Sequence, residues 1–434
     1  MTSPRLLPLL DELMRRAGRG MSLGLERMAR ALEALGNPER RCPFVHVAGT
    51  NGKGSTSAMV DAIARASGLR TGLYTSPHLC RFAERIQIDG EPVSDEALAD
   101  ALERAFAVAP EATFFETVTL AGFVAFERAG IDFGVLEVGL GGRLDATNVL
   151  EAPLCTSVTS IAFDHVALLG DTLGAIAREK AGIFRPGVPV VLGPLEPEAL
   201  DATLEVASAV GAGPIWRVGR EGEAGEGIIG VRRAGEELSI ELPDGRTIAV
   251  RQALAGAHQV ANTAVAVATA ARAAARFPAM NGAIAEGVAG ARWAGRLERI
   301  EKDGITVLLD CAHNPHGAAA LAAHLRAEGI GPERAVLVFG ALADKAWTGM
   351  LDALAPCADR RVYAAPKGRA PASPRDLASR WPGEEAPEGR DAIARALEVA
   401  ARDGGVVVVA GSIYLVGEIR GALLGKPCDP VVAL

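Results

Sequence analysis

The sequence predicts an α/β protein with two domains: an N-terminal, mostly parallel sheet of the P-loop type with a small antiparallel patch, and a C-terminal Rossmann-like domain. The chain has 434 residues, which is too many for one ordinary core. Short apolar runs alternate with segments of helical periodicity, a pattern typical of a parallel sheet covered on both faces. A glycine-rich loop joins the first apolar run to a helix. We place the domains at residues 1–289 and 290–434.

The N-terminal domain begins with helical periodicity over most of residues 1–40, interrupted near residues 18–20. Strands are expected at residues 44–48, 71–75, 133–138, 155–161 and 188–192. Helices are expected at residues 55–67, 113–129, 172–182 and 258–276, and the second and third of these have the clearest pattern. The segment 215–252 differs, because its short alternating runs flank Asp244-Gly245, a dipeptide typical of hairpin turns. This segment is the predicted antiparallel patch.

The boundary between the domains is expected at residues 277–292, where Phe277-Pro278 and Asn281-Gly282 break the pattern. Beyond it the α/β alternation resumes. Strands are expected at residues 305–309, 335–339, 361–364 and 405–410. The segment 366–374 is rich in Pro, Ala and Gly, so we expect a surface loop there.

Composition excludes several classes of partner. The net charge is −8 and the sequence has no run of Lys and Arg that can neutralise a nucleic-acid backbone. The six cysteines form no C-x-x-C pair, which favours reduced thiols. No uncharged apolar run reaches the ~18 residues that cross a bilayer, and the N-terminus has no signal-peptide pattern. We therefore expect a cytoplasmic protein that binds neither nucleic acid nor membrane. A monomer is also expected, although no sequence pattern determines the oligomeric state.

The loop Gly49-Thr50-Asn51-Gly52-Lys53-Gly54-Ser55 is predicted to bind the phosphates of ATP. A loop between a strand and a helix directs backbone N–H groups at an anion, and the glycines permit a close approach. Lys53 can reach the β- and γ-phosphates, and Ser55 offers a hydroxyl. The spacing differs from the common G-x-x-x-x-G-K-[ST] motif. The alternative, a tight turn that needs glycine, does not explain the lysine.

Three further polar residues in this domain are candidates for the same site. Glu137 ends an apolar strand, where a carboxylate can hold Mg²⁺; the alternative is an acid that bonds the following glycine turn. His165 also follows a strand, although Mg²⁺ prefers oxygen and a lone histidine is commonly a satisfied polar group. Lys180 has the spacing of a solvated lysine on an amphipathic helix, which the residues alone favour.

A second polar cluster lies in the C-terminal domain, where a strand ends in Asp310, His313, Asn314 and His316 before a helix. Packing does not readily explain two histidines, an acid and an amide together. Asp310 can bond a ribose and His313 can contact a phosphate oxygen.

Taken together, these motifs resemble the folylpolyglutamate synthases and dihydrofolate synthases of the Mur ligase superfamily. The resemblance runs over nearly the whole chain and is carried by residues 22–26, 47–55, 74–79, 137–148, 164–165, 179–183, 258–262, 295–298, 310–315 and 411–418. There are two departures: Asp310-Cys311 stands where the family has Asp-Gly, and Asp344-Lys345 is followed by Ala346 instead of an acid.

The resemblance implies roles residue by residue. Nucleotide contacts are implied for Thr50, Asn51, Gly52, Lys53, Gly54, Ser55, Asn262, Arg296 and Asp310. Mg²⁺ ligands are implied at Ser76, Glu137 and His165, and Lys180 matches a carbamylated lysine that would join a second Mg²⁺. Catalytic roles are implied for Lys53, Lys180 and His313. Pterin contacts are implied for Ser22, Leu23, Gly24, Leu25, Thr113, Phe114, Phe115, Glu116, Leu144, Asp145 and Ala146.

The implied reaction is ATP-dependent addition of L-glutamate to dihydropteroate and to folates through an acyl phosphate. One alternative is a folylpolyglutamate synthase without the first activity. A cell-wall amino-acid ligase is disfavoured, since only 48 residues precede Gly49. An ATP-binding regulator without turnover is the alternative of another class, and it would not need Glu137, His165 and Lys180 together.

Overall fold

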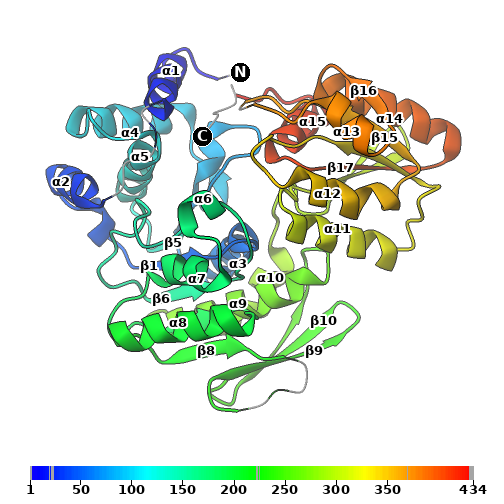
Figure 1. The fold of residues 1–434 in the computed structure, drawn as a ribbon. Helices are drawn as coiled ribbons and strands as arrows, with labels where there is room; N and C mark the ends of the chain where they lie inside the picture. The colour runs from blue at the N-terminus through cyan, green and yellow to red at the C-terminus, as the bar shows by residue number, and fades with distance from the viewer. Residues whose placement is uncertain are drawn as a thin grey trace. The chain divides into compact units, whose positions relative to one another are not determined.

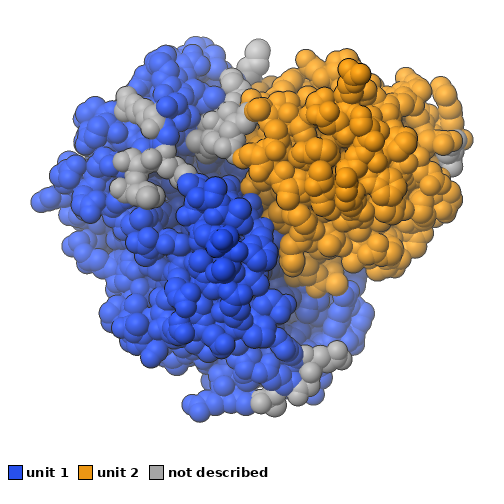
Figure 2. Space-filling model, viewed as in Figure 1, with its two compact units in different colours: residues 1–78, 83–253, 259–292 blue, residues 79–82, 254–258, 293–434 orange. Residues whose placement is uncertain are grey.

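The computed structural model describes residues 2–18, 20, 24–220, 223, 225–368 and 370–429. The chain divides into two compact units (Figure 2). Unit 1 contains residues 1–78, 83–253 and 259–292, and unit 2 contains residues 79–82, 254–258 and 293–434. Whether the boundary that we place between residues 289 and 290 separates independently folding domains stays a prediction.

The described part of unit 1 is built on an 11-stranded sheet in the order β11-β10-β9-β8-β7-β6-β1-β5-β2-β3-β4. Its strands are β1 (Phe44–Ala48), β2 (Thr71–Tyr74), β3 (Ile86–Ile88), β4 (Glu91–Pro92), β5 (Phe133–Glu137), β6 (Cys155–Val158), β7 (Val190–Leu192), β8 (Ile215–Val218), β9 (Ile228–Ala234), β10 (Glu237–Glu241) and β11 (Thr247–Arg251). Strands β6, β1, β5 and β2 are neighbours and parallel. Their carboxyl ends therefore share one edge of the sheet.

Helices of unit 1 pack against this sheet (Figure 1). The helices of this unit are α1 (Leu6–Ala17), α2 (Glu26–Leu35), α3 (Lys53–Ala66), α4 (Asp95–Val108), α5 (Phe114–Ala129), α6 (Val166–Leu169), α7 (Leu173–Ala181), α8 (Pro197–Val210), α9 (His258–Ala273) and α10 (Met280–Gly290), with 3₁₀ turns at Pro38–Arg40 and Phe82–Arg85. Helices α1 and α2 pack instead on α4 and α5. Apolar residues of α7 and α8 pack with those of β6 and β7 in one buried cluster. Strands β1, β5, β6 and β7 are buried along their whole length, as is typical of strands that helices cover on both faces.

The predicted antiparallel patch is confirmed for β9, β10 and β11, which pair antiparallel. The hairpin turn falls at Asp244-Gly245, where Gly245 has φ +87°. Strand β8 instead extends the parallel part of the sheet, since it pairs parallel with β7 and β9. The antiparallel β3 and β4 beside β2 were not expected, because β4 has only two residues and both are exposed.

The segment 277–292, where the boundary is expected, contains a helix, and the division between the units falls at its end, between residues 292 and 293. Residues 280–290 form α10, which packs on α3 within unit 1. Ile284 and Val288 are buried, and Gly287 lets the backbone of Ile63 approach to 2.3 Å from where a Cβ would stand. Burial of this face outweighs the low helix propensity of Asn281 and Gly282, which is worth about 1 kcal/mol for glycine.

The described part of unit 2 contains a six-stranded sheet in the order β12-β13-β17-β14-β15-β16, parallel except for β12. Its strands are β12 (Glu298–Lys302), β13 (Ile305–Leu309), β14 (Ala335–Phe339), β15 (Arg360–Ala364), β16 (Glu384–Ala386) and β17 (Val406–Ala410). Its helices are α11 (Pro315–Ala327), α12 (Trp347–Leu354), α13 (Pro374–Arg380), α14 (Gly389–Asp403) and α15 (Ile413–Leu424), with a 3₁₀ turn at Ala355–Cys357. Alternate strand residues enter two cores, one under α11, α12 and α13 and the other under α14 and α15. The predicted Rossmann-like architecture is confirmed.

Among the described residues, no helix combines the length and the apolar character needed to cross a membrane.

Candidate nucleotide and substrate site

The phosphate loop follows β1 and leads directly into α3, so the first N–H groups of that helix face the loop. Gly49 has φ +146° and Gly52 has φ +89°, both in the region that favours glycine. A Cβ on Gly49 would stand 2.0 Å from Thr159 Oγ1, and one on Gly52 would stand 2.2 Å from Asn262 Oδ1. The glycines are therefore required by packing as well as by the turn.

Residues that follow β6 hold the loop in shape. The hydroxyls of Thr159 and Ser160 donate to the Asn51 carbonyl at 2.7 and 3.0 Å. The hydroxyl of Thr50 donates to the Ala162 carbonyl at 3.2 Å. Since these bonds use a carbonyl and a hydroxyl of the loop and no N–H group of α3, they leave the helix N-terminus available to an anion.

Two lysines converge on one carbonyl of this loop. Lys53 Nζ donates to the Gly49 carbonyl at 3.1 Å and to the Thr50 carbonyl at 3.3 Å. Lys180, at the end of α7, donates to the same Gly49 carbonyl at 2.9 Å. Burial, followed by the charge of Lys53, lowers the pKa of Lys180 to about 7. Lys180 is 5% exposed, so the solvated lysine that its spacing favours is wrong.

The predicted nucleotide residue Asn262 lies beside the phosphate loop, on α9. Its side chain donates to Gln259 Oε1 at 2.9 Å, and Gln259 Nε2 donates to Ser55 Oγ at 3.2 Å. The Thr56 hydroxyl donates to the Asn262 carbonyl at 3.5 Å. The structure thus brings together residues more than 200 positions apart, as one nucleotide site in unit 1 requires.

The three proposed Mg²⁺ ligands follow strands whose carboxyl ends share the edge that carries the phosphate loop. Ser76 follows β2, Glu137 ends β5 in register with Val47 of β1, and His165 follows β6. Glu137 is 4% exposed, whereas the His165 side chain is 37% exposed and its Nε2 lies 3.8 Å from Asp164 Oδ1. The oxygen donors of Ser76 and Glu137 suit Mg²⁺, and the His165 nitrogen suits it less. No cluster of three His, Cys, Asp or Glu residues able to hold a metal occurs among the residues that the structure describes.

Two predicted substrate segments are linked by an ion pair. Thr113 caps α5 and forms a reciprocal capping box with Glu116, whose Oε2 accepts from the Thr113 N–H at 2.8 Å. The other carboxylate oxygen of Glu116 accepts from Arg27 of α2 at 2.8 Å. Arg27 follows Gly24 and Leu25, so this pair joins the two segments. Ser22 and Leu23 lie outside the described residues.

The second substrate segment packs against the glycine turn that leads to the third. A Cβ on Gly139 would stand 2.3 Å from the ring of Phe115, so this ring lies directly on the glycine turn. Phe114 is buried, with the Arg85 guanidinium 5.5 Å from its ring centre. Asp145 is also buried, while Leu144 is half-buried and Ala146 is buried. The described substrate residues therefore converge at the edge where β5 ends.

The second polar cluster belongs to unit 2. Asp310 follows β13, and its two carboxylate oxygens accept from the N–H groups of Leu297 at 3.0 Å and Ala312 at 2.9 Å. Burial raises the pKa of Asp310, and the nearby Arg296 opposes this. His313 Nδ1 lies 2.8 Å from the Cys311 carbonyl. Asn314 caps α11 through the Gly317 N–H, which gives this predicted cluster member a structural role.

Sequence reasoning missed two buried polar residues in unit 1. His46 lies on β1, three residues before the phosphate loop, and Thr147 follows Asp145; their side chains are 2.8 Å apart. The signal for His46 was a single polar residue within an apolar strand. Arg27 was also missed, because its partner Glu116 is 89 residues away.

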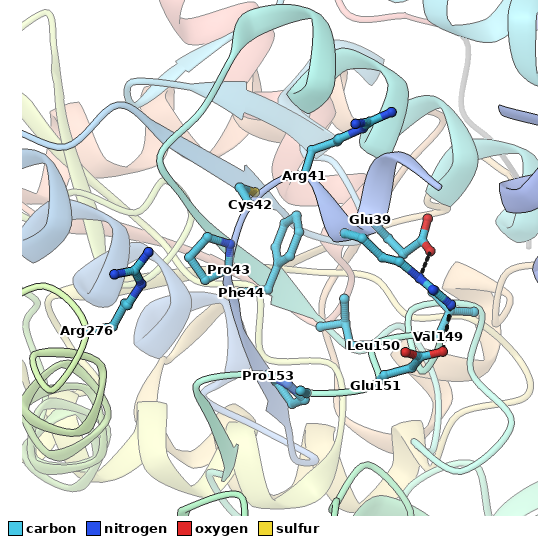
Figure 3. A pocket seen from close by; sticks show the side chains of 12 residues that line it. Glu39, Arg41, Cys42, Pro43, Phe44, Val149, Leu150, Glu151, Pro153 and Arg276 are labelled. Atoms are coloured by element: carbon cyan, nitrogen blue, oxygen red, sulfur yellow. Dashed lines mark hydrogen bonds and ion pairs between the residues drawn. The ribbon is translucent and has the colours of Figure 1, made fainter. Parts of the chain in front are cut away.

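A cavity of about 380 Å³ lies elsewhere in unit 1, at the amino ends of β1 and β6. Figure 3 shows Arg276 on the opposite side of this cavity from Glu39 and Glu151. Arg40 bonds both of these carboxylates, at 3.2 and 2.7 Å. Because the phosphate loop follows the other end of β1, this cavity is separate from the candidate site.

Comparisons with known proteins agree with this geometry. Residues 47–270 match the Mur ligase middle domain, and residues 295–413 match the Mur ligase glutamate ligase domain. The folylpolyglutamate synthase of Lacticaseibacillus casei is 38% identical over 92% of this chain and 94% of its own.

Two solved structures are also similar. The Escherichia coli FolC structure in complex with DHPP and ADP has a TM-score of 0.83 and 30% identity, over 98% of this chain and 99% of that one. The Yersinia pestis bifunctional folylpolyglutamate synthase/dihydrofolate synthase, complexed with AMPPNP and Mn ion, has a TM-score of 0.83 and 31% identity, over 98% of both chains.

Proposed function

The chain belongs to the folylpolyglutamate and dihydrofolate synthase family of Mur ligases, and on that premise we propose that it joins L-glutamate to dihydropteroate and to the γ-carboxylate of folates. Like its family it is an ATP-dependent ligase that forms C–N bonds. The observation that carries the choice of acceptor is the contact between Phe115 and the glycine turn after Glu137, which supports a pterin site beside the phosphate loop.

ATP is proposed to lie with its phosphates at the N-terminus of α3. The positive φ angles of Gly49 and Gly52 and the position of Lys53 support this placement. The ADP and AMPPNP complexes of the E. coli and Y. pestis proteins support it as well. Asn262 is proposed to contact the nucleotide from α9, and Arg296 and Asp310 are also proposed nucleotide contacts.

The proposed reaction has two steps. A carboxylate oxygen of the acceptor attacks the γ-phosphorus of ATP, so that an acyl phosphate forms and ADP leaves. The glutamate amine then attacks the acyl carbon, and inorganic phosphate leaves with the former carboxylate oxygen. Lys53 neutralises charge on the transferred phosphoryl group, and the chain contributes mainly by positioning. His313 is proposed to contact a phosphate oxygen.

Mg²⁺ is proposed to be held by Ser76, Glu137 and His165. When bound, Mg²⁺ would neutralise phosphate charge. The oxygen donors of Ser76 and Glu137 fit this ion, and the Mn ion in the Y. pestis structure supports a divalent metal. Lys180 is proposed to react with CO₂ and become a carbamate near a second Mg²⁺. The lowered pKa of its amine supports this, because only the neutral amine can react.

An acceptor comparison tests the proposed function. Purified protein is incubated with ATP, Mg²⁺ and L-glutamate, with either dihydropteroate or tetrahydrofolate, and product masses are measured. We expect both acceptors to gain one glutamyl residue. If only tetrahydrofolate reacts, the chain is a folylpolyglutamate synthase alone, an alternative that the name of the L. casei relative favours. If neither acceptor reacts while ATP still binds, the result favours the alternative hypothesis of an ATP-binding regulator without turnover. The monomeric state and cytoplasmic location stay predictions.

A further inference from the structure

The carboxylate of Asp145 accepts three hydrogen bonds from the turn on which it lies. Its Oδ1 accepts from the Thr147 hydroxyl at 2.6 Å and from the Thr147 N–H at 3.0 Å. Its Oδ2 accepts from the Leu140 N–H at 2.9 Å. Both carboxylate oxygens are therefore engaged by hydrogen bonds from the turn. Asp145 is 6% exposed, so its side chain faces the turn and not solvent.

The Thr147 hydroxyl determines which ring nitrogen of the buried His46 carries the hydrogen. It has one hydrogen, which it donates to Asp145, so it must accept the bond from His46 Nε2 at 2.8 Å. His46 is 1% exposed on β1, and burial lowers its pKa to about 3. A neutral imidazole carries one N–H, and this contact assigns it to Nε2.

We propose that His46, Thr147 and Asp145 form a positioning chain that ties the turn of residues 139–147 to β1, and that Asp145 orients the pterin-binding segment through this chain without touching the pterin. The inference rests on the proposed function, because it takes residues 144–146 as part of the dihydropteroate site. Strand β1 also carries the phosphate loop. The positioning chain therefore sets the acceptor segment relative to the loop where the γ-phosphate is proposed to lie.

A purely structural role for these bonds predicts a different result. Loss of a buried hydrogen bond then lowers thermal stability and leaves the KM for every substrate as it was. A positioning role shifts the turn that carries Leu144 and Ala146, so that the KM for dihydropteroate rises. The KM for ATP should change little, because Thr159, Ser160 and Ala162 hold the phosphate loop independently.

The test uses the full chain with pairs of variants. Thr147→Val removes the hydroxyl at similar volume, and Thr147→Ser restores it. His46→Leu removes the Nε2 donor, and His46→Gln replaces it with an amide N–H. We expect Thr147→Val, which loses a hydrogen bond to the carboxylate of Asp145, to raise the KM for dihydropteroate by at least about tenfold. His46→Leu loses a bond to the neutral Thr147 hydroxyl, so we expect a smaller rise, of about fivefold. The Ser and Gln variants should recover most of this loss.

A double variant and Asp145→Asn separate the possible outcomes. If the three residues act as one chain, Thr147→Val with His46→Leu is no worse than the more harmful single change, whereas multiplied losses overturn the inference. Unchanged KM values in Thr147→Val, with a raised KM in Asp145→Asn, also overturn it and make Asp145 a direct ligand. If Asp145→Asn itself leaves the KM for dihydropteroate unchanged, the assignment of this segment to the pterin is what fails.

Discussion

Replacement of Lys180 by methionine is expected to abolish ligation and yet to stabilise the protein. Methionine matches the lysine side chain as far as Cε and suits the buried position, but it carries no amine. The Gly49 carbonyl that Lys180 bonds keeps its second donor, Lys53 Nζ at 3.1 Å. The substitution therefore removes a buried charge without leaving that acceptor unpaired.

The size of the expected stabilisation follows from the pKa of Lys180, which falls from 10.5 to about 7 because burial opposes the charged form. Between these values the unfolded chain binds the proton and the folded protein does not, so the free energy of unfolding rises with pH. The native lysine thus destabilises the fold most below pH 7. The penalty there is about 5 kcal/mol, because each unit of difference between the two pKa values contributes ~1.4 kcal/mol. The penalty is about 4 kcal/mol at pH 7 and about 2 kcal/mol at pH 9.

Urea unfolding of both proteins at pH 7 and pH 9, in buffer free of CO₂ and metal, measures this difference. We expect Lys180→Met to be more stable by an amount that shrinks by about half between the two pH values. Lys426→Met replaces an exposed lysine and serves as the control, with no such gain. A Met variant no more stable than the native protein at pH 7, or an advantage that does not shrink at pH 9, refutes the reasoning. Full ligase activity in this variant would refute the proposed role of the amine.

Three further changes test other parts of the account. Gly52→Ala should weaken ATP binding at least about tenfold, because its Cβ would stand 2.2 Å from Asn262 Oδ1. Gly68→Ala has a similar φ of +86° with nothing within 4 Å, so titration with a nucleotide analogue should find its affinity unchanged. Thr113→Val and Ser94→Ala each remove a helix cap, on α5 and α4, so each should lower the free energy of unfolding by about 1 kcal/mol. Only Thr113→Val should also raise the KM for dihydropteroate. Glu137→Gln should raise the Mg²⁺ concentration for half-maximal rate at least about tenfold and leave metal-free nucleotide binding unchanged; an unaltered Mg²⁺ requirement would exclude Glu137 as a ligand.

The sequence predicted most of the sheet because buried parallel strands are continuous apolar runs, as in β1, β5 and β17. Strand β4 was not predicted, because Glu91 and Pro92 have no strand signal and their extended conformation depends on pairing with β3. Helix α10 was not predicted, because Asn281-Gly282 is a dipeptide typical of turns. Only burial against α3 reverses that local preference.

The candidate site was likewise predictable from the sequence only in part. The phosphate loop and Asp310 stand out locally, because polar residues directly follow apolar strands. The environment of Lys180 does not, since its burial depends on packing of α7 against a loop 131 residues earlier. The capping box of Thr113 and Glu116 has a recognisable spacing, but its ion pair with Arg27 joins residues 89 positions apart. Such distant partners follow from the topology of the sheet and not from any local pattern.

The central claim is that the loop from Gly49 to Ser55 presents a γ-phosphate to the carboxylate of a folate-type acceptor. Dihydropteroate labelled with ¹⁸O in its carboxylate, incubated with the protein, ATP, Mg²⁺ and L-glutamate, tests it directly. Mass spectrometry of the released phosphate should find one ¹⁸O in each phosphate formed, because the acceptor oxygen attacks phosphorus and leaves with it. Unlabelled phosphate, whether or not dihydrofolate is formed, would contradict the acyl phosphate route and the placement of the acceptor at this loop.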